Sequence, residues 1–205
     1  MKFSIIIPAH NSEAFIQNAL ESIRKQTYKD YELIVICDAC TDQTEKIAKE
    51  YGARTESVNF HCDGLTRNRG MELAAGEWIL FMDDDDWWIH EYVLDQLAEK
   101  IDECPFAEII CFSFIFRHVG YARPIRKNGH HWIAAWSKCY KRQSIGDARF
   151  GDSRDGSADV QFFGQIFDGS RIHLDWDMPM YYYNYWRDNS ISCKYTPDLR
   201  GKDIL

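Results

Sequence analysis

The sequence predicts an α/β fold in which a mostly parallel sheet is flanked by helices. Apolar, strand-like runs alternate with amphipathic, helix-like segments through residues 3–82, and the connections between them are short. Alternation of this kind places parallel strands side by side, with their connecting helices on the two faces of the sheet. The polar residues that directly follow the strands are therefore expected to meet at one edge of the sheet.

Three of the four expected strands in this part, at 3–7, 31–37 and 78–82, are runs rich in apolar and β-branched residues. The strands cover residues 3–7, 31–37, 53–60 and 78–82. The helices between them are expected at 12–25, from 41 or 42 to 51, and at 65–75. Ser12 is expected to cap the first helix, and Thr41 or Asp42 the second, because short polar side chains accept hydrogen bonds from the first helical amides. Gly52 and Gly76 are expected to end the second and third helices.

The second half of the chain is less regular. Helices are expected at 90–103 and 157–167, and strands at 107–119 and 171–186, with residues 121–126 pairing back onto the strand at 107–119. The chain has no internal repeat and no linker rich in proline and glycine. We therefore expect residues 1–205 to form one domain.

The composition excludes several classes of function. Hydrophobic residues make up 45% and charged residues 27% of the chain, as in ordinary globular proteins. The net charge of −8 argues against a nucleic-acid partner, which needs a basic surface. No stretch approaches the ~18 apolar residues of a membrane span, and the N-terminus lacks the pattern of a signal peptide. We expect a cytoplasmic protein with no transmembrane segment.

The seven cysteines do not suggest a metal centre. Cys37 and Cys40 have CxxC spacing, but no second pair follows, and a structural zinc site needs four ligands. Reduced thiols are the expected state in a cytosolic protein.

A run of four carboxylates directly follows the expected strand at 78–82. Its members are Asp83, Asp84, Asp85 and Asp86. A divalent cation would relieve their mutual repulsion, and Mg²⁺ and Mn²⁺ both prefer oxygen ligands. The alternative is that the run is a solvated face or the first turn of a helix. Asp86 is expected to have that second role, ahead of the helix at 90–103.

Two common nucleotide-binding motifs are absent. No GxGxxG follows the first strand, where Pro8-Ala9-His10-Asn11 stands instead, and no GxxxxGK[ST] occurs in the chain. Dinucleotide-binding and P-loop interpretations therefore lack their main support.

The ordered combination of four sequence blocks resembles the inverting glycosyltransferases of family 2, which have the GT-A fold. The first two blocks are SIIIPAHNSEAFIQNALESIRKQTYKDYELIVICDACTDQT, from Ser4, and LTRNRGMELAAGEWILFMDDDDWW, from Leu65. Weaker matches follow at WSKCYKR (136–142) and YNYWRDNSIS (183–192). The resemblance implies a nucleotide-binding half at 1–88 and an acceptor-binding half at 89–205.

The resemblance also assigns roles to individual residues. Pro8, Ala9 and His10 would line the base and ribose of a nucleotide, with Glu13 nearby. Asp38 would accept a hydrogen bond from a uracil ring, and Arg67 would approach the pyrophosphate. Asp83 and Asp84 would lie nearer the ribose, and Asp85 would hold Mn²⁺ or Mg²⁺. The chemistry agrees, because a cation between the phosphates neutralises charge that develops on the leaving diphosphate.

An inverting transfer needs a general base for the acceptor hydroxyl. In the family this base is the Asp of a Glu-Asp pair, and here Asp159 matches while Ala158 replaces the Glu. Asp152 and Asp155 are the rival carboxylates, and Asp159 as an ordinary first-turn acid is the alternative.

Further residues are candidates for the acceptor side or for a closing loop. Trp136 and Lys138 are predicted to line the acceptor, although buried aromatics usually belong to the core. His130 and His131 are weaker candidates for acceptor or metal. Arg187 and Ser190 are candidates for a loop that closes over the diphosphate.

The resemblance thus implies metal-assisted transfer of a sugar from a nucleotide-sugar, with a UDP-sugar expected, to a glycan or lipid-linked acceptor. Polysaccharide or glycan biosynthesis is the implied setting, and peripheral association with a membrane is compatible with a lipid-linked acceptor. Two alternatives stay open at this point. One is a non-catalytic nucleotide- or glycan-binding module, and the other is a nucleotidyltransferase of similar fold, although its Lys-rich phosphate loop is absent.

Overall fold

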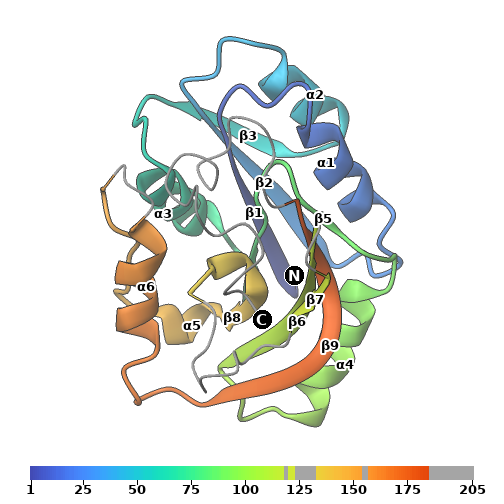
Figure 1. Ribbon diagram of the computed structural model, residues 1–205, viewed down its shortest axis with the longest axis vertical. Coiled ribbons are helices and arrows are strands. Elements are labelled where there is room, and N and C mark those ends of the chain that lie inside the picture. The colour runs from blue at the N-terminus through green and yellow to red at the C-terminus, as the bar shows by residue number, and fades with distance from the viewer. Residues whose placement is uncertain (118–119, 123–132, 154–156, 185–205) are drawn as a thin grey trace.

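The computed structural model describes residues 1–117, 120–122, 133–153 and 157–184 of the 205-residue chain (Figure 1). The strands within these ranges are β1 Phe3–Ala9, β2 Tyr31–Asp38, β3 Arg54–Val58, β4 Trp78–Phe81, β5 Trp87–Trp88, β6 Ile109–Phe116, β7 Gly120–Ala122, β8 Lys138–Lys141 and β9 His173–Tyr183. The helices are α1 Ile16–Arg24, α2 Thr44–Glu50, α3 Asp63–Leu73, α4 Val93–Glu103, α5 Arg142–Ile145 and α6 Ala158–Ile166, with a 3-10 turn, η1, at Ala135–Ser137.

These strands form one sheet in the order β3-β2-β1-β4-β8-β6-β9-β5, and β7 pairs with β6. β1 is parallel to β2 and β4, and β2 is parallel to β3. β8 lies antiparallel between β4 and β6, while β9 runs parallel to β6. The predicted α/β fold is confirmed, but the sheet is mixed rather than mostly parallel, because the strands of the second half add antiparallel pairings at β4–β8, β6–β8, β6–β7 and β5–β9.

β1 is buried on both faces, which explains its unbroken apolar sequence. Phe3, Ile5 and Ile7 belong to the core beneath α1, whereas Ile6 belongs to the core beneath α3. In Figure 1, α1, α2 and α4 lie on one side of the sheet and α3, α5 and α6 on the other. α3 approaches β1 so closely that a Cβ atom at Gly70 would lie 2.3 Å from Cγ2 of Ile6. A glycine is therefore needed at this helix position.

The elements expected in the second half form where they were predicted. β6 and β9 occupy the two expected strands, β7 pairs back onto β6, and α6 falls within 157–167. β8 was not predicted. Its four residues include two lysines, and its place between β4 and β6 depends on partners far away in the sequence.

The predicted role of Ser12 as the cap of the first helix is wrong. α1 begins only at Ile16, and the Ser12 side chain donates a hydrogen bond to the Asp84 carboxylate instead. Its backbone carbonyl accepts from the amides of Phe15 and Ile16, both at 2.9 Å. The second helix begins at Thr44 with Gln43 at the N-cap position, so the prediction of Thr41 or Asp42 as its cap is wrong. The Asp42 carboxylate still accepts from the amide of Thr44 at 3.0 Å, from one position further out.

No helix within the described residues has the length and apolar character needed to cross a bilayer.

Candidate active site

The polar residues at the carboxyl ends of β1, β2 and β4 lie next to one another, as the parallel order requires. Pro8 and Ala9 are the last residues of β1 and pair with Ile36 and Cys37. Both are buried, so the exposed side chain at this strand end is that of His10. The amide of His10 donates to the Asp84 carboxylate at 3.4 Å, which joins the ends of β1 and β4.

Asp38 ends β2, and its carboxylate accepts hydrogen bonds from the loop that precedes α3. Its oxygens accept from the backbone amides of Phe60, His61 and Cys62 at 2.7, 2.9 and 2.9 Å, and from the Thr66 hydroxyl at 3.0 Å. Burial raises the pKa of Asp38, but the amides of His61, Cys62 and Phe60 lower it by more, so the pKa lies below its usual value. Asp38 is therefore an anion that organises this loop.

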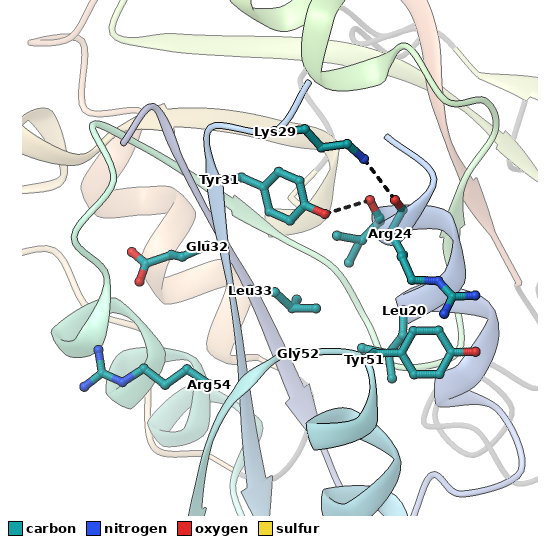
Figure 2. A pocket seen from close by; sticks show the side chains of 10 residues that line it. Leu20, Arg24, Lys29, Tyr31, Glu32, Leu33, Tyr51, Gly52 and Arg54 are labelled. Carbon is teal, nitrogen blue, oxygen red and sulfur yellow. Dashed lines mark hydrogen bonds between the residues drawn. The ribbon is translucent and has the colours of Figure 1, made fainter. Parts of the chain in front are cut away.

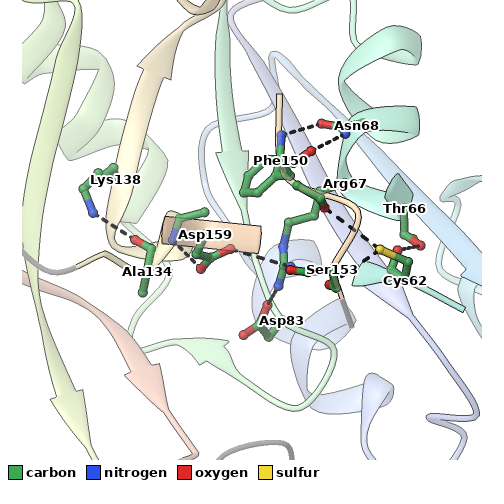
Figure 3. Close-up of polar contacts among 12 residues, drawn as sticks. Cys62, Thr66, Arg67, Asn68, Asp83, Ala134, Lys138, Phe150, Ser153 and Asp159 are labelled. Atoms are coloured by element: carbon green, nitrogen blue, oxygen red, sulfur yellow. Dashed lines mark hydrogen bonds and ion pairs between the residues drawn. The ribbon is translucent and has the colours of Figure 1, made fainter. Parts of the chain in front are cut away.

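Arg67 is the central cation of the site (Figure 3). Its Nη2 donates to Oδ1 of Asp83 at 2.8 Å, and its Nη1 lies 3.8 Å from Oδ1 of Asp159. The guanidinium also lies over the Phe150 ring, 5.7 Å from its centre. One guanidinium thus joins the end of β4 to the first turn of α6, two segments that are far apart in the sequence.

The charged groups around Arg67 shift one another's pKa values. Burial lowers the pKa of Arg67, but Asp159 and Asp83 raise it by more, so the guanidinium stays charged. Burial raises the pKa of Asp83 to about 6, against the opposing effect of Arg67 and with a contribution from Asp85. The Nε atom of Arg67 is buried and has no hydrogen-bond partner within the described part of the chain. An anionic ligand would offer an acceptor to this group.

Asp159 has the contacts expected of an oriented carboxylate. Its Oδ2 accepts from the backbone amide of Ala135 at 3.1 Å, while Oδ1 faces Arg67. Its neighbour Ala158, which stands where the family has a Glu, is 4% exposed. A Cβ built on Gly64 of α3 would lie only 3.0 Å from the Cβ of Ala158. α3 therefore leaves little room for a longer side chain at position 158.

The prediction that Asp86 lies in the first turn of the following helix is wrong. α4 begins only at Val93, and the Asp86 side chain is fully buried. It accepts from the Tyr181 hydroxyl and from the amide of Asn184, both at 2.7 Å. Burial raises the pKa of Asp86 well above its usual value. Asp86 therefore connects the run of four aspartates at 83–86, called the acid run below, to β9 through the Tyr181 hydroxyl.

Three further predicted site residues, Trp136, Lys138 and Glu13, make other contacts. Trp136 stacks on Tyr181 with 4.7 Å between ring centres and is 5% exposed. Lys138 is 1% exposed, and its Nζ donates to the carbonyl of Ala134 at 2.9 Å. Glu13 accepts from the amide of Gln43 at 3.0 Å.

Of the two rival carboxylates, the structure places only one. Asp152 is exposed. Asp155, His130, His131, Arg187 and Ser190 lie outside the described residues.

The side chains alone do not form a complete metal site. Within the described ranges, no group of three or more His, Cys, Asp or Glu side chains is arranged to hold a metal ion. Mg²⁺ and Mn²⁺ are nevertheless compatible with the carboxylates that follow β4, because Mg²⁺ is commonly held by one or two carboxylates together with substrate phosphates and water. The donor set thus fits a cation that arrives with a phosphate ligand.

A separate cavity of about 430 Å³ opens at the opposite end of β2 (Figure 2). β3 begins opposite Ile34, so the first residues of β2 have no partner on that side, and the hollow forms there. Leu33 lies at its centre, with Arg54 and Arg24 on opposite sides. None of the predicted site residues lines this cavity.

Comparison with known proteins identifies the family. The model of glycosyl transferase family 2 matches residues 4–155. The chain belongs to this family. It is 35% identical to EpsH of Bacillus subtilis, which is named a glycosyltransferase, over 165 residues that cover 69% of this chain and 47% of EpsH. It is 37% identical to TarS of Staphylococcus aureus, a poly(ribitol-phosphate) β-N-acetylglucosaminyltransferase, over 50% of this chain and 19% of TarS.

Solved structures of family members give the same assignment. The crystal structure of S. aureus TarS 1–349 in complex with UDP-GlcNAc superposes with a TM-score of 0.82 and 25% identity, over 94% of this chain and 61% of that one. The complex of the same fragment with UDP gives a TM-score of 0.79 and 27% identity, over 89% of this chain and 60% of that one. The fold of this family 2 chain is therefore GT-A. The chain spans about half of EpsH and less than two thirds of the TarS fragment.

Several residues of the site were missed in the sequence. Ser12 and Tyr181 contact the acid run, and the amides of residues 60–62 surround Asp38. A serine after a turn and a tyrosine in an aromatic strand carry no local signal for these contacts, which span 72 and 95 residues of sequence. The loop at 60–62 could have been suspected from its place between a strand and a helix at the ligand-binding edge.

Proposed function

We propose that this family 2 chain transfers a sugar from a UDP-sugar to an acceptor hydroxyl with inversion, and that Asp159 is the general base. One observation carries the proposal. The guanidinium of Arg67 contacts both Asp83, at the end of β4, and Asp159, in the first turn of α6. The proposed base and the acid run therefore border one site, as the two sides of a transfer reaction require.

The positions of these residues support the following roles in the transfer reaction. The acceptor oxygen forms a bond to the anomeric carbon while the bond from that carbon to the diphosphate oxygen breaks. The hydroxyl proton passes to a carboxylate oxygen of Asp159, whose orientation the Ala135 amide holds. Arg67 lies where its charge can bind the diphosphate, and its unpaired Nε is a further donor.

A bound Mn²⁺ or Mg²⁺ would supply neutralisation of the charge on the leaving diphosphate, and Asp85 is the residue we propose to hold it. Asp85 is close enough to Asp83 to raise its pKa.

The donor class is supported by the TarS structures, which are described as complexes with UDP and with UDP-GlcNAc. The acceptor is proposed to be a glycan or a lipid-linked sugar, in line with the poly(ribitol-phosphate) acceptor in the name of TarS. We propose that Trp136 and Lys138 belong to the acceptor side of the site. Their burial means that they could act by shaping that side rather than by an exposed contact.

The decisive experiment compares Asp159→Asn with Asp152→Asn, a matched change at an exposed carboxylate. Transfer from UDP-GlcNAc and UDP-glucose is measured as UDP release with Mn²⁺ and a panel of glycan acceptors, and UDP affinity is measured separately. We expect Asp159→Asn to bind UDP within about threefold of the unmodified protein and to lose roughly 10²- to 10⁴-fold in transfer, as for loss of a general base. Asp152→Asn should change neither quantity.

Two outcomes would overturn parts of this proposal. Full transfer by Asp159→Asn together with its loss in Asp152→Asn would move the base to Asp152. UDP binding without turnover of any donor by the unmodified protein would favour a nucleotide-binding module. The buried Ala158 stands where the family has a Glu, and this replacement is the observation that favours testing the binding-module alternative.

A further inference from the structure

Residues 149–151 lie against both α3 and α6, and a side-chain amide from each helix holds them. Asn68 of α3 donates from Nδ2 to the carbonyl of Phe150 at 3.0 Å, and its Oδ1 accepts from the Phe150 amide at 2.9 Å (Figure 3). Gln165 of α6 pairs in the same way with Arg149, at 2.8 and 3.1 Å. An amide side chain carries a donor and an acceptor side by side, so it can satisfy both backbone groups of one residue. The bonds of Asn68 are partly buried, whereas Gln165 and Arg149 are exposed.

The ring of Phe150 touches three parts of the site. It stacks on Phe162 of α6 with 4.0 Å between ring centres, and it packs edge-on against Phe81 of β4 at 5.1 Å. The Arg67 guanidinium lies over the same ring, 5.7 Å from its centre. Phe150 is therefore in contact with the helix that carries Asp159, with the central cation, and with the strand that precedes the acid run.

The chain is packed closely against both helices at Gly151. A Cβ on Gly64 of α3 would lie 1.9 Å from the Gly151 carbonyl oxygen, and a Cβ on Gly151 would lie 2.2 Å from Oε1 of Gln161 on α6. Because such packing leaves no free space, a shift of this segment is passed on to the helices. The contact between Arg67 and Asp159 is sensitive to such a shift, since its 3.8 Å is already close to the ~4 Å limit of an ion pair.

We propose that Asn68 is a positioning residue for sugar transfer, and that it acts by holding Phe150. Phe150 in turn keeps the first turn of α6, with Asp159, beside Arg67. This rests on the proposed function, because it takes Asp159 as the base. Without Asn68, the buried backbone groups of Phe150 would shift to find other partners, and α6 would follow the ring that stacks on Phe162. A displacement of about 1 Å at a catalytic group is enough to slow a reaction roughly a hundredfold.

The test measures kcat and KM with whichever of UDP-GlcNAc and UDP-glucose reacts faster, and UDP affinity separately. Asn68→Ala should lower kcat roughly ten- to a hundred-fold and leave KM and UDP affinity within about threefold, because the base is displaced while the nucleotide site is kept. Gln165→Ala is the matched control. It removes an equal pair of bonds from the neighbouring Arg149, but these are exposed and water replaces them, so kcat should stay within about threefold.

A double-mutant cycle tests whether Asn68 acts through Phe150. Phe150→Leu keeps an apolar side chain but removes the ring that Arg67 and Phe162 contact. In that background Asn68→Ala should lower kcat by no more than about threefold, since the same connection is already broken. An equal loss of kcat from Asn68→Ala with and without the Phe150 ring would overturn the inference.

Asn68→Asp is a milder variant, and thermal unfolding confirms that each variant is folded. It keeps an acceptor for the Phe150 amide and loses only the donor to the carbonyl, so it should lower kcat by at least about threefold without raising KM. An unchanged kcat in folded Asn68→Ala or Asn68→Asp protein would overturn the inference. A loss in Gln165→Ala as large as that in Asn68→Ala would also overturn it, because any weakening of the segment would then have the same effect.

The inference and the proposed function fail differently. A protein that transfers sugar, loses this activity in Asp159→Asn and keeps it in Asn68→Ala would overturn this inference alone. A protein that binds UDP but transfers no sugar would overturn the proposed function and, with it, this inference.

Discussion

The hydroxyl of Tyr181 donates a hydrogen bond to the buried carboxyl group of Asp86 at 2.7 Å and accepts one from the amide of Asp83 at 3.0 Å. One hydroxyl on β9 therefore fixes two positions of the acid run that follows β4. The run is held by the second half of the chain, although its residues come from the first.

Removal of this hydroxyl should destabilise the protein. Tyr181→Phe leaves the ring stacked on Trp136 but leaves a donor and an acceptor unpaired in a buried environment. We expect a loss of about 1–3 kcal/mol in the free energy of unfolding, measured by urea denaturation. Tyr182→Phe is the control, because Tyr182 contacts Trp87 through its ring, with 4.4 Å between ring centres. Equal stability of the two variants would show that the Tyr181 hydroxyl contributes nothing.

Lys138 should give the folding stability a specific dependence on pH. Burial lowers the pKa of Lys138 from 10.5 to about 8. Between these two values the unfolded chain binds more protons than the folded one, so stability rises with pH across this window. Lys138→Met should therefore be more stable than the unmodified protein near pH 7, by up to roughly 3 kcal/mol.

The measurement for Lys138 is chemical denaturation from about pH 7 to 10, with Lys46→Met as an exposed control. The advantage of Lys138→Met should shrink steadily as pH rises through this range, while the control stays parallel to the unmodified protein. An advantage independent of pH would mean that the Lys138 ammonium is not destabilised by burial.

The metal assignment predicts a defect in binding that depends on the metal. Asp85→Asn should bind UDP in the presence of Mn²⁺ no more tightly than the unmodified protein binds it with a chelator, because the carboxylate that joins cation and protein is lost. Calorimetric titration with and without Mn²⁺ measures both affinities, and Asp152→Asn serves as the control. An undiminished stimulation by Mn²⁺ in Asp85→Asn would remove Asp85 from the metal site.

Restoring the Glu of the family pair should harm the fold. Ala158→Glu places a long charged side chain at a buried position where α6 approaches Gly64 of α3 closely, so we expect a loss of about 1–3 kcal/mol in stability. Ala158→Ser, a small polar change, should cost clearly less. Thermal unfolding of both variants checks the order. A stable and more active Ala158→Glu would show that α6 can move away from α3 and that the missing Glu limits activity.

Much of the fold follows from local patterns. The four strands and three helices predicted within residues 3–82 all form, although the first helix begins at Ile16 rather than Ser12. The apolar runs of β1, β2 and β4 are buried, as such runs predict. The convergence of His10, Asp38 and the acid run also follows, since parallel strands end at the same edge. Their roles toward nucleotide, metal and acceptor are still predictions.

Local patterns could not predict contacts made across the chain. Asp86 resembles a first-turn acid in the sequence, yet Tyr181, 95 residues later, makes it a buried group. Ser12 resembles a helix cap, yet Asp84, 72 residues later, takes its hydroxyl. Both local alternatives are weak interactions, and a buried partner outweighs them.

The sequence by itself determined which acids end β4 and which residues end β1 and β2, because apolar periodicity places the strands and their ends. Only the tertiary structure decided which of those acids is buried, that Arg67 joins Asp83 to Asp159, and that the carboxylate of Asp38 holds a loop. The physical reason is that burial and charge pairing depend on which distant segments meet, and no local pattern contains that information.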